Sequence, residues 1–355
     1  MHLVLVRTVA GLERLAAEEV VAAGHRVVEM SKRQVVVEWA PGESAPPRLA
    51  DDVFVVHGVA VDPGRTRDAL AAAIRSLELP AGQGAFAVSA SFVGARNYNR
   101  FDIEDLVGAR LGGRYYSRRD GAVPPVERSE WRVVLDGKTL WVGQRPYAVP
   151  LHRRAWRTRT VRGSLHPPVA AAMARLAAIE PDDRVLDPFC GAGTLLLEAQ
   201  AINPQATYTG IDRDPAAITA ARENAALAGA RENAAEAASR EAQGAGGVAC
   251  TPRPRVPRAA GAGDAGIRWR CADAACLDGS VERIITNPPW GHRLAIGDLA
   301  PYVRRWREVL DGVLVAIVNP EQAARIDRGW RVQAAYDLSV AGQHARIVVA
   351  EPSRS

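Results

Sequence analysis

The pattern of hydrophobic and polar positions changes character at about residue 166 of this 355-residue chain. Before that point, short apolar strands and amphipathic helices follow one another without regular alternation, which is typical of an α+β module. After it, strands and helices alternate, which predicts a doubly wound, mainly parallel sheet. The predicted fold class is therefore α/β, with a smaller α+β part in front.

The first 150 residues predict two parts, residues 1–50 and residues 51–150. Residues 1–50 read as strand, helix, strand, strand, at about 3–9, 12–22, 27–30 and 34–39. Residues 51–150 predict strands at 53–61 and 85–93, helices at 66–77 and 101–111, and a hairpin formed by 131–137 and 138–144. The hairpin is the clearest of these elements because its side chains alternate with period 2.

The second half predicts the alternating sheet. Helices are expected at 166–178, 194–202, 215–227 and about 302–310, and strands at 184–186, 207–211, 267–271, 281–286, 313–318, 331–338 and 345–351. The alternation is interrupted at 230–265, where ARENAA of 221–226 recurs at 230–235 and an Ala/Gly/Pro/Arg tract follows. Its low apolar content predicts a mostly disordered surface insertion, with an RNA-binding arm as the alternative.

Charge changes this picture by indicating a polyanionic partner. The chain has 45 basic and 40 acidic residues, a net charge of +5, and only Lys32 and Lys138 are lysines. Residues 87–163 contain 15 basic and 7 acidic side chains, so the excess positive charge lies in this stretch. Such asymmetry favours nucleic acid as partner, and an ordinary solvated surface is the alternative.

Other chemistries receive no support from the sequence. The four cysteines form no CxxC pair and there is no HExxH motif, so neither a zinc site nor a disulfide framework is expected. No apolar run approaches the roughly 20 residues that span a bilayer, and the N-terminus has no signal-peptide pattern. We expect a cytoplasmic protein, a monomer, that needs neither a membrane nor a metal.

The first informative motif is DPFCGAGT at residues 187–194. A strand that ends in Asp187, a glycine-rich turn and a helix that begins near Thr194 direct backbone amides toward a ligand at the edge of the sheet. This geometry suits an adenosyl cofactor. The third glycine of a dinucleotide G-x-G-x-x-G is replaced by Leu196, which argues against NAD or FAD.

Two further acids follow the next two strands. Asp212 ends the second strand, where a carboxylate can accept both ribose hydroxyls, and Asp273 follows the third, where it can accept from the adenine amino group. Each could instead be a helix cap or a turn residue. Three acids after three successive strands make coincidence an unsatisfactory explanation.

The second motif is NPPWG, which ends the strand at 281–286. Proline cannot continue a ladder of hydrogen bonds, so the strand stops and the backbone stiffens. The Asn287 side chain and the Pro288 carbonyl can accept both N–H groups of an exocyclic amine, and Trp290 offers a ring face to a planar base. The alternative is a rigid turn beside a core tryptophan.

These motifs resemble class I S-adenosylmethionine-dependent methyltransferases that act on amino groups, and most closely the THUMP-domain RNA guanine-N2 methyltransferases. TVAGLERLAAEEV in residues 1–50 is similar to their ferredoxin-like unit, residues 85–146 resemble their THUMP module, and LHRRAWRTRT resembles their basic linker. The resemblance implies a ferredoxin-like unit at 1–50, a THUMP-like domain at 51–150, a linker at 151–165 and a Rossmann-like methyltransferase domain at 166–355. Asparagine at the start of NPPW indicates a guanosine in the tRNA acceptor stem, or the related ribosomal RNA type.

The resemblance also implies roles for particular residues. Asn287, Pro288, Pro289 and Trp290 would hold the target base; Asp187, Pro188, Cys190, Gly191, Gly193, Thr194, Asp212, Arg213, Asp273 and Asn287 would surround S-adenosylmethionine; and Arg153, Arg154, Arg157 and Arg159 would contact RNA. Of these, Cys190 is expected only to pack and Arg213 to stack on adenine. Methyltransferases for DNA amino groups or protein glutamine, and a catalytically silent RNA-binding protein, are the competing interpretations.

Overall fold

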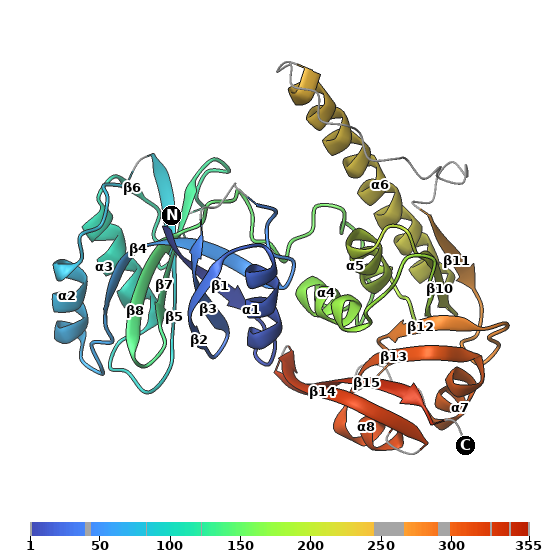
Figure 1. The fold of residues 1–355 in the computed structure, drawn as a ribbon. Coiled ribbons are helices and arrows are strands. Elements are labelled where there is room, and N and C mark those ends of the chain that lie inside the picture. The colour runs from blue at the N-terminus through green and yellow to red at the C-terminus, as the bar shows by residue number, and fades with distance from the viewer. Residues whose placement is uncertain are drawn as a thin grey trace. The chain divides into compact units, whose positions relative to one another are not determined.

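The computed structural model describes residues 2–39, 44–82, 84–121, 123–244, 266–289, 299–326, 329–340 and 342–353, and for residues 231–244 it describes the backbone alone. The chain divides into two compact units, Met1–His152 and Arg153–Ser355. Each unit is built on a sheet of its own, as Figure 1 shows. The boundary falls between His152 and Arg153, so residues 153–165 of the basic linker lie with the second unit.

The first unit contains one sheet in the order β2-β3-β1-β4-β8-β7-β5-β6. Its elements are β1 (His2–Thr8), α1 (Glu13–Ala22), β2 (Arg26–Ser31), β3 (Gln34–Trp39), β4 (Ala50–Val61), α2 (Arg67–Ser76), β5 (Ala85–Phe92), α3 (Arg100–Leu111), β6 (Arg114–Tyr115), β7 (Ser129–Leu135) and β8 (Thr139–Gln144). Strand β4 pairs with β1 on one side and with β8 on the other. The two predicted parts, 1–50 and 51–150, therefore share one sheet. Their identification as ferredoxin-like and THUMP-like stays a prediction.

The predicted helices and strands of this unit are confirmed, and local chemistry explains several boundaries. Helix α3 begins at a capping box, in which the Asn99 side chain accepts from the Phe101 and Asp102 amides and the Asp102 carboxylate accepts from the Asn99 amide. Strand β6 was not predicted because two residues carry no periodic signal.

The second unit contains a sheet in the order β11-β10-β9-β12-β13-β15-β14. Its elements are α4 (Pro167–Leu176), β9 (Arg184–Asp187), α5 (Thr194–Ile202), β10 (Thr207–Asp212), α6 (Pro215–Gly244), β11 (Ile267–Cys271), β12 (Val281–Thr286), α7 (Ala300–Val309), β13 (Leu310–Val318), α8 (Pro320–Ile326), β14 (Trp330–Val340) and β15 (Gln343–Pro352). Neighbouring strands from β11 to β13 are parallel, and β15 is antiparallel to both of its neighbours. The doubly wound parallel sheet is confirmed, with one strand reversed.

Helix α6 differs from the prediction. It was expected to end near residue 227, with a disordered insertion at 230–265, but the helix continues to Gly244. The reason is composition, because residues 230–243 are rich in alanine, glutamate and arginine, which are strong helix formers. The prediction of disorder is therefore wrong for 230–244, and residues 245–265 lie outside the described residues.

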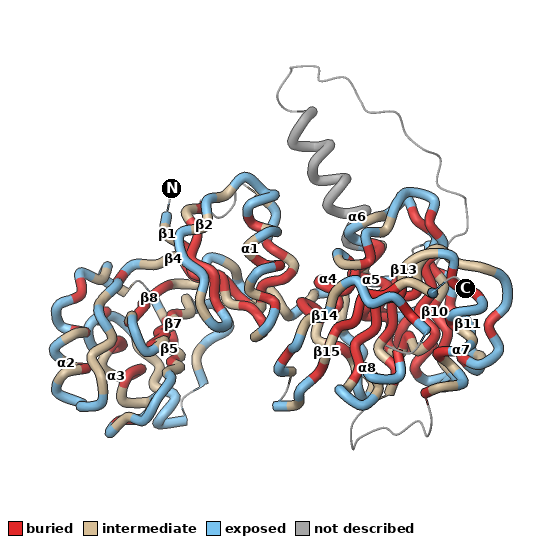
Figure 2. Tube along the Cα trace, turned by 60° about the horizontal axis from the view of Figure 1, so that its bottom comes forward, coloured by how far each residue is buried: buried red, intermediate tan, exposed pale blue. Residues whose placement is uncertain are grey.

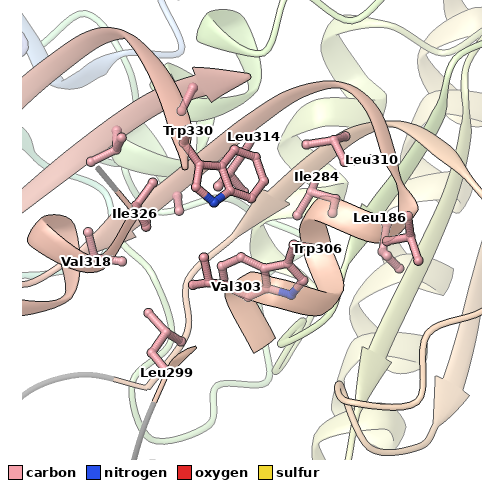
Figure 3. Close-up of a cluster of buried hydrophobic side chains, with 14 of the residues drawn as sticks. Leu186, Ile284, Leu299, Val303, Trp306, Leu310, Leu314, Val318, Ile326 and Trp330 are labelled. Carbon is pink, nitrogen blue, oxygen red and sulfur yellow. The ribbon is translucent and has the colours of Figure 1, made fainter. Parts of the chain in front are cut away.

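Buried side chains cover both faces of the second sheet and hold the ends of its strands in place. Figure 2 shows buried residues along the strands of the second unit. On one face, the core includes Trp306 of α7 and Trp330 of β14, which pack with Leu314, Ile284 and other apolar side chains, as drawn in Figure 3. On the other face, α5 is buried from Thr194 to Gln200. A sheet covered in this way holds the ends of its strands rigidly.

Candidate functional site

A cavity of about 680 Å³ lies at the carboxyl edge of the second sheet, where β9, β10 and β12 end. Among the predicted residues, its lining contains Asp187, Pro188, Cys190, Gly191, Thr194, Asp212, Arg213, Asp273, Asn287, Pro288 and Pro289. The structure therefore brings the two motifs together, although about 100 residues separate them in the sequence. Trp290 lies outside the described residues, and its role stays a prediction.

Asp187 connects the two motifs directly. It ends β9, is 1% exposed, and its Oδ1 accepts hydrogen bonds from the Phe189 amide at 3.1 Å and from Thr286 Oγ1 at 2.9 Å. Thr286 ends β12 and immediately precedes Asn287. Burial raises the pKa of Asp187 to about 7, because removal from water disfavours its charged form. A cationic ligand beside this carboxylate would favour the ionised form.

The glycine-rich turn keeps its shape because no side chain fits at its second glycine. Gly193 has a φ of +79° and precedes α5, and a Cβ placed there would approach the Trp269 ring to 2.7 Å. Gly193 thus shapes the turn and, unlike Gly191, does not line the cavity.

Cys190 is buried, and burial raises the pKa of its thiol well above the ordinary value, so it stays protonated and packs as expected.

Asp212 supports the same turn from the next strand. One carboxylate oxygen accepts from the Gly191 amide at 2.9 Å, and the other accepts from the Asp214 amide at 2.9 Å. Asp273 accepts from the Ala275 amide at 2.7 Å, and a bond to the amide two residues further on is typical of an aspartate in a turn. Both side chains also line the cavity, and each carboxylate oxygen can accept more than one bond. Their roles toward ribose and adenine stay proposals.

Side-chain hydrogen bonds from Asn287 and from Gln322 hold the Asn-Pro-Pro turn. Asn287 Nδ2 donates to the Gly163 carbonyl at 3.1 Å, which directs the amide oxygen away from that partner. Gln322 of α8 donates through Nε2 to the Pro289 carbonyl at 3.1 Å. Gln322 was not identified from the sequence, because nothing in its helix indicates that it faces a turn more than 30 residues upstream.

The four linker arginines do not form one surface. Arg154 is 11% exposed and its Nε donates to Glu198 Oε1 at 2.6 Å, where the Glu198 side chain is fully buried. Arg157 Nε lies 3.4 Å from Thr194 Oγ1 and Nη2 donates to the Leu165 carbonyl, and burial lowers its pKa. Arg153 is exposed, and Arg159 forms an exposed ion pair with Glu223. The expectation of four RNA-facing arginines thus differs from the structure at Arg154 and Arg157.

The remaining walls come from residues that the sequence analysis did not assign to the cavity. Val161 to Leu165 of the linker form one wall, and Tyr302, Val340 and Gln343 contribute to another. Val340 and Gln343 lie at the tip of the β14–β15 hairpin. In sheet order this tip lies beyond β12 and β13, on the side away from Asp212 and Asp273. The cavity therefore extends along the edge of the sheet from Asp273 to the hairpin tip at Gln343.

The residues present fit S-adenosylmethionine. Asp187, Asp212, Asp214 and Asp273 provide four carboxylates for a ligand with cationic sulfonium and ammonium groups and two ribose hydroxyls. Across the described part of the chain, no group of three or more His, Cys, Asp or Glu side chains is placed to hold a metal ion. In the same part, every helix is too short or too polar to cross a membrane.

This sheet order, with acids after successive strands and Asn-Pro-Pro at the same edge, defines the second unit as a class I methyltransferase fold. Comparisons with known proteins agree: residues 154–243 match the RMKL-like methyltransferase domain family. A tRNA (guanine(6)-N2)-methyltransferase of Thermus thermophilus is 29% identical over 95% of this chain and 93% of its own length.

Solved structures of methyltransferases align with this chain over nearly its whole length. The crystal structure of TrmN from Thermus thermophilus aligns with a TM-score of 0.70 and 25% identity, over 99% of this chain and 100% of TrmN. A possible methylase from Clostridium difficile aligns with a TM-score of 0.76 over 100% of this chain and 99% of its own, and its 16% identity supports the fold alone. The predicted resemblance to the RNA guanine-N2 methyltransferases is confirmed.

Proposed function

We propose that this protein transfers a methyl group from S-adenosylmethionine to the exocyclic N2 of a guanosine in tRNA. The observation that carries the proposal is the position of Asn287-Pro288-Pro289 on the same cavity as Asp187, Asp212 and Asp273. The full-length similarity to a tRNA (guanine(6)-N2)-methyltransferase supports guanosine 6 of the acceptor stem as the target.

The residues of the chain act by binding and orientation. S-adenosylmethionine supplies a methyl group that is activated by its positive sulfonium. Asn287 accepts one N–H of the guanine amino group and the Pro288 carbonyl accepts the other, which directs the nitrogen lone pair toward the cofactor half of the cavity. Such positioning can contribute roughly 7–11 kcal/mol to lowering the barrier without a strong base. Gln322 and Gly163 keep the turn in this orientation.

The target base must leave its helix to reach the cavity. Flipping a paired guanine costs a few kcal/mol, and contacts to the RNA backbone can offset this cost. The positive stretch at 87–163, which includes Arg153 and Arg159, is the proposed source of those contacts. Trp290 is proposed to stack on the flipped base, as expected from the sequence. We further propose that the chain acts as a cytoplasmic monomer with a THUMP-like first unit.

The test is transfer of labelled methyl to tRNA transcripts that differ in one base. A transcript with guanosine at position 6 should accept one or more methyl groups, and N2-methylguanosine should be found by mass spectrometry after digestion. A matched transcript with inosine at position 6 lacks only the exocyclic amine and should accept none. Equal labelling of both transcripts would exclude N2 of this nucleotide as the target, and no labelling of either would contradict the proposed substrate.

A further inference from the structure

We propose that Asn224 is a positioning residue that holds linker residues 158–165 against the glycine-rich turn and thereby makes the linker a wall of the cofactor cavity. The proposal rests on the proposed function, because it assigns the linker to the same S-adenosylmethionine site. The linker resembles an RNA-binding segment in sequence, and we assign residues 158–165 the additional role of enclosing the cofactor.

The first observation is the set of hydrogen bonds that Asn224 makes. Its side chain is fully buried on α6. Oδ1 accepts from the backbone amides of Thr158 at 3.1 Å and Arg159 at 3.0 Å, while Nδ2 donates to the carbonyls of Arg159 at 2.9 Å and Ala192 at 3.0 Å. One amide therefore joins the linker backbone to the backbone of the glycine-rich turn. No other common side chain of this size offers two acceptor and two donor positions together.

The second observation is that the linker then continues directly over the cofactor residues. Val161 packs on Gly191, where a Cβ would lie 3.3 Å from Val161 Cγ2. Ser164 Oγ accepts from the Val161 amide at 2.9 Å, which closes a turn, and Gly163 accepts from Asn287. Residues 161–165 all line the cavity. The linker residues that follow the contact with Asn224 thus form the wall of the cavity, and Gly163 among them supports the orientation of Asn287.

Asn224 belongs to the first copy of the ARENAA repeat, and this provides a matched control. The second copy places Asn233 in the same sequence context on the same helix. Asn224→Asp keeps the size and the acceptor of the side chain but replaces the donor to Ala192 and Arg159 with a carboxylate oxygen. Asn233→Asp makes the same chemical change nine positions later.

Two measurements on the full chain test the proposal without tRNA. Trypsin should cleave Asn224→Asp within 153–162 at least about tenfold faster than wild type, and calorimetry should show S-adenosylmethionine binding weakened by about tenfold or more. Asn233→Asp should match wild type in both. A saturating concentration of S-adenosylmethionine should slow the extra cleavage of Asn224→Asp, because bound ligand stabilises the state in which the linker lies against the glycine-rich turn.

The outcomes separate this inference from the proposed function. Wild-type protein that binds no S-adenosylmethionine would contradict the proposed function. Wild-type binding together with unchanged cleavage and affinity in Asn224→Asp would overturn the role of Asn224 alone. If Asn224→Asp instead loses thermal stability and is cleaved throughout, Val161→Ala decides the question, because it alters the wall without the buried amide. Unchanged cofactor affinity in Val161→Ala would then refute the linker as a wall.

Discussion

Asp187 shows how one buried carboxylate makes this site sensitive to pH. In the unfolded chain its pKa is near 3.8, and in the folded protein burial raises it to about 7. The folded state therefore binds the proton more tightly than the unfolded chain. The resulting stabilisation is complete below about pH 4, declines as the pH rises from about 4 to 7, and is absent above that range.

We expect Asp187→Asn to remove most of this pH dependence. The asparagine oxygen can still accept from Phe189 and Thr286, because both bonds go to Oδ1. Without cofactor, the free energy of unfolding of wild type should fall by up to roughly 4 kcal/mol between pH 4 and pH 8 relative to Asp187→Asn. Urea unfolding at several pH values measures this difference. The exposed Asp278→Asn should behave like wild type, and parallel curves for wild type and Asp187→Asn would contradict the assignment.

Asn287 is expected to act on the transfer step and not on cofactor binding. Asn287→Ala removes the acceptor for the guanine amine, so single-turnover methyl transfer to tRNA should fall by about 100-fold or more, comparable to the loss of one oriented transition-state partner. Asn287→Asp should be milder because a carboxylate still accepts from the amine. Cofactor affinity, measured in parallel, should change little. Wild-type turnover in Asn287→Ala would exclude this role.

At the scale of elements, the buried helix α5 explains why the linker cannot be only an RNA-binding arm. Glu198 lies on α5 with no exposed side-chain surface, and its carboxylate forms an ion pair with Arg154 of the linker. A buried charge that loses its partner is strongly destabilising. Arg154 of the linker therefore contributes to neutralising a buried charge on the helix that follows the glycine-rich turn.

Arg154→Ala is consequently expected to lower the free energy of unfolding by about 3–5 kcal/mol. Its neighbour Arg153 is exposed, so Arg153→Ala should change stability by no more than about 0.5 kcal/mol. Arg153→Ala should instead reduce the dependence of RNA binding on salt by about one phosphate contact. Urea unfolding and RNA binding at several salt concentrations measure both effects. Equal stability of the two variants would mean that the ion pair with Glu198 contributes little.

Much of the fold could be predicted from the sequence because its signals are local. The alternation in β7 and β8, the Gly-rich turn before α5 and the prolines after β12 each determine their own structure. The site was predicted where acids follow strands, since parallel strands bring their ends to one edge. Asn224, Gln322 and the hairpin tip at Gln343 were missed, because their roles depend on packing between distant segments. Helix α6 was predicted to end too early, because the low sequence complexity of residues 230–244 was interpreted as a sign of disorder.

At the scale of the whole molecule, the two units are expected to divide cofactor binding from RNA binding. All residues that line the cavity belong to Arg153–Ser355, whereas most of the basic stretch at 87–163 belongs to the first unit. Because the second unit has its own sheet and core, it should fold alone. The boundary between His152 and Arg153 then matters, since a cut at residue 166 would remove the linker wall and the ion pair of Arg154 with Glu198.

Two truncated chains test this division. Residues 153–355 should bind S-adenosylmethionine within about threefold of the full chain, while methyl transfer to tRNA at low RNA concentration should fall by about 100-fold or more, because phosphate contacts dominate RNA affinity. Residues 166–355 should bind the cofactor at least about tenfold more weakly or fail to fold, since they lack the linker wall and the ion pair between Arg154 and the buried Glu198. Calorimetry and single-turnover transfer measure the two properties. Full transfer activity in 153–355 would show that the first unit is not needed for RNA binding. Equal cofactor affinity in both fragments would show that the linker, although it lines the cavity, contributes nothing to holding the cofactor.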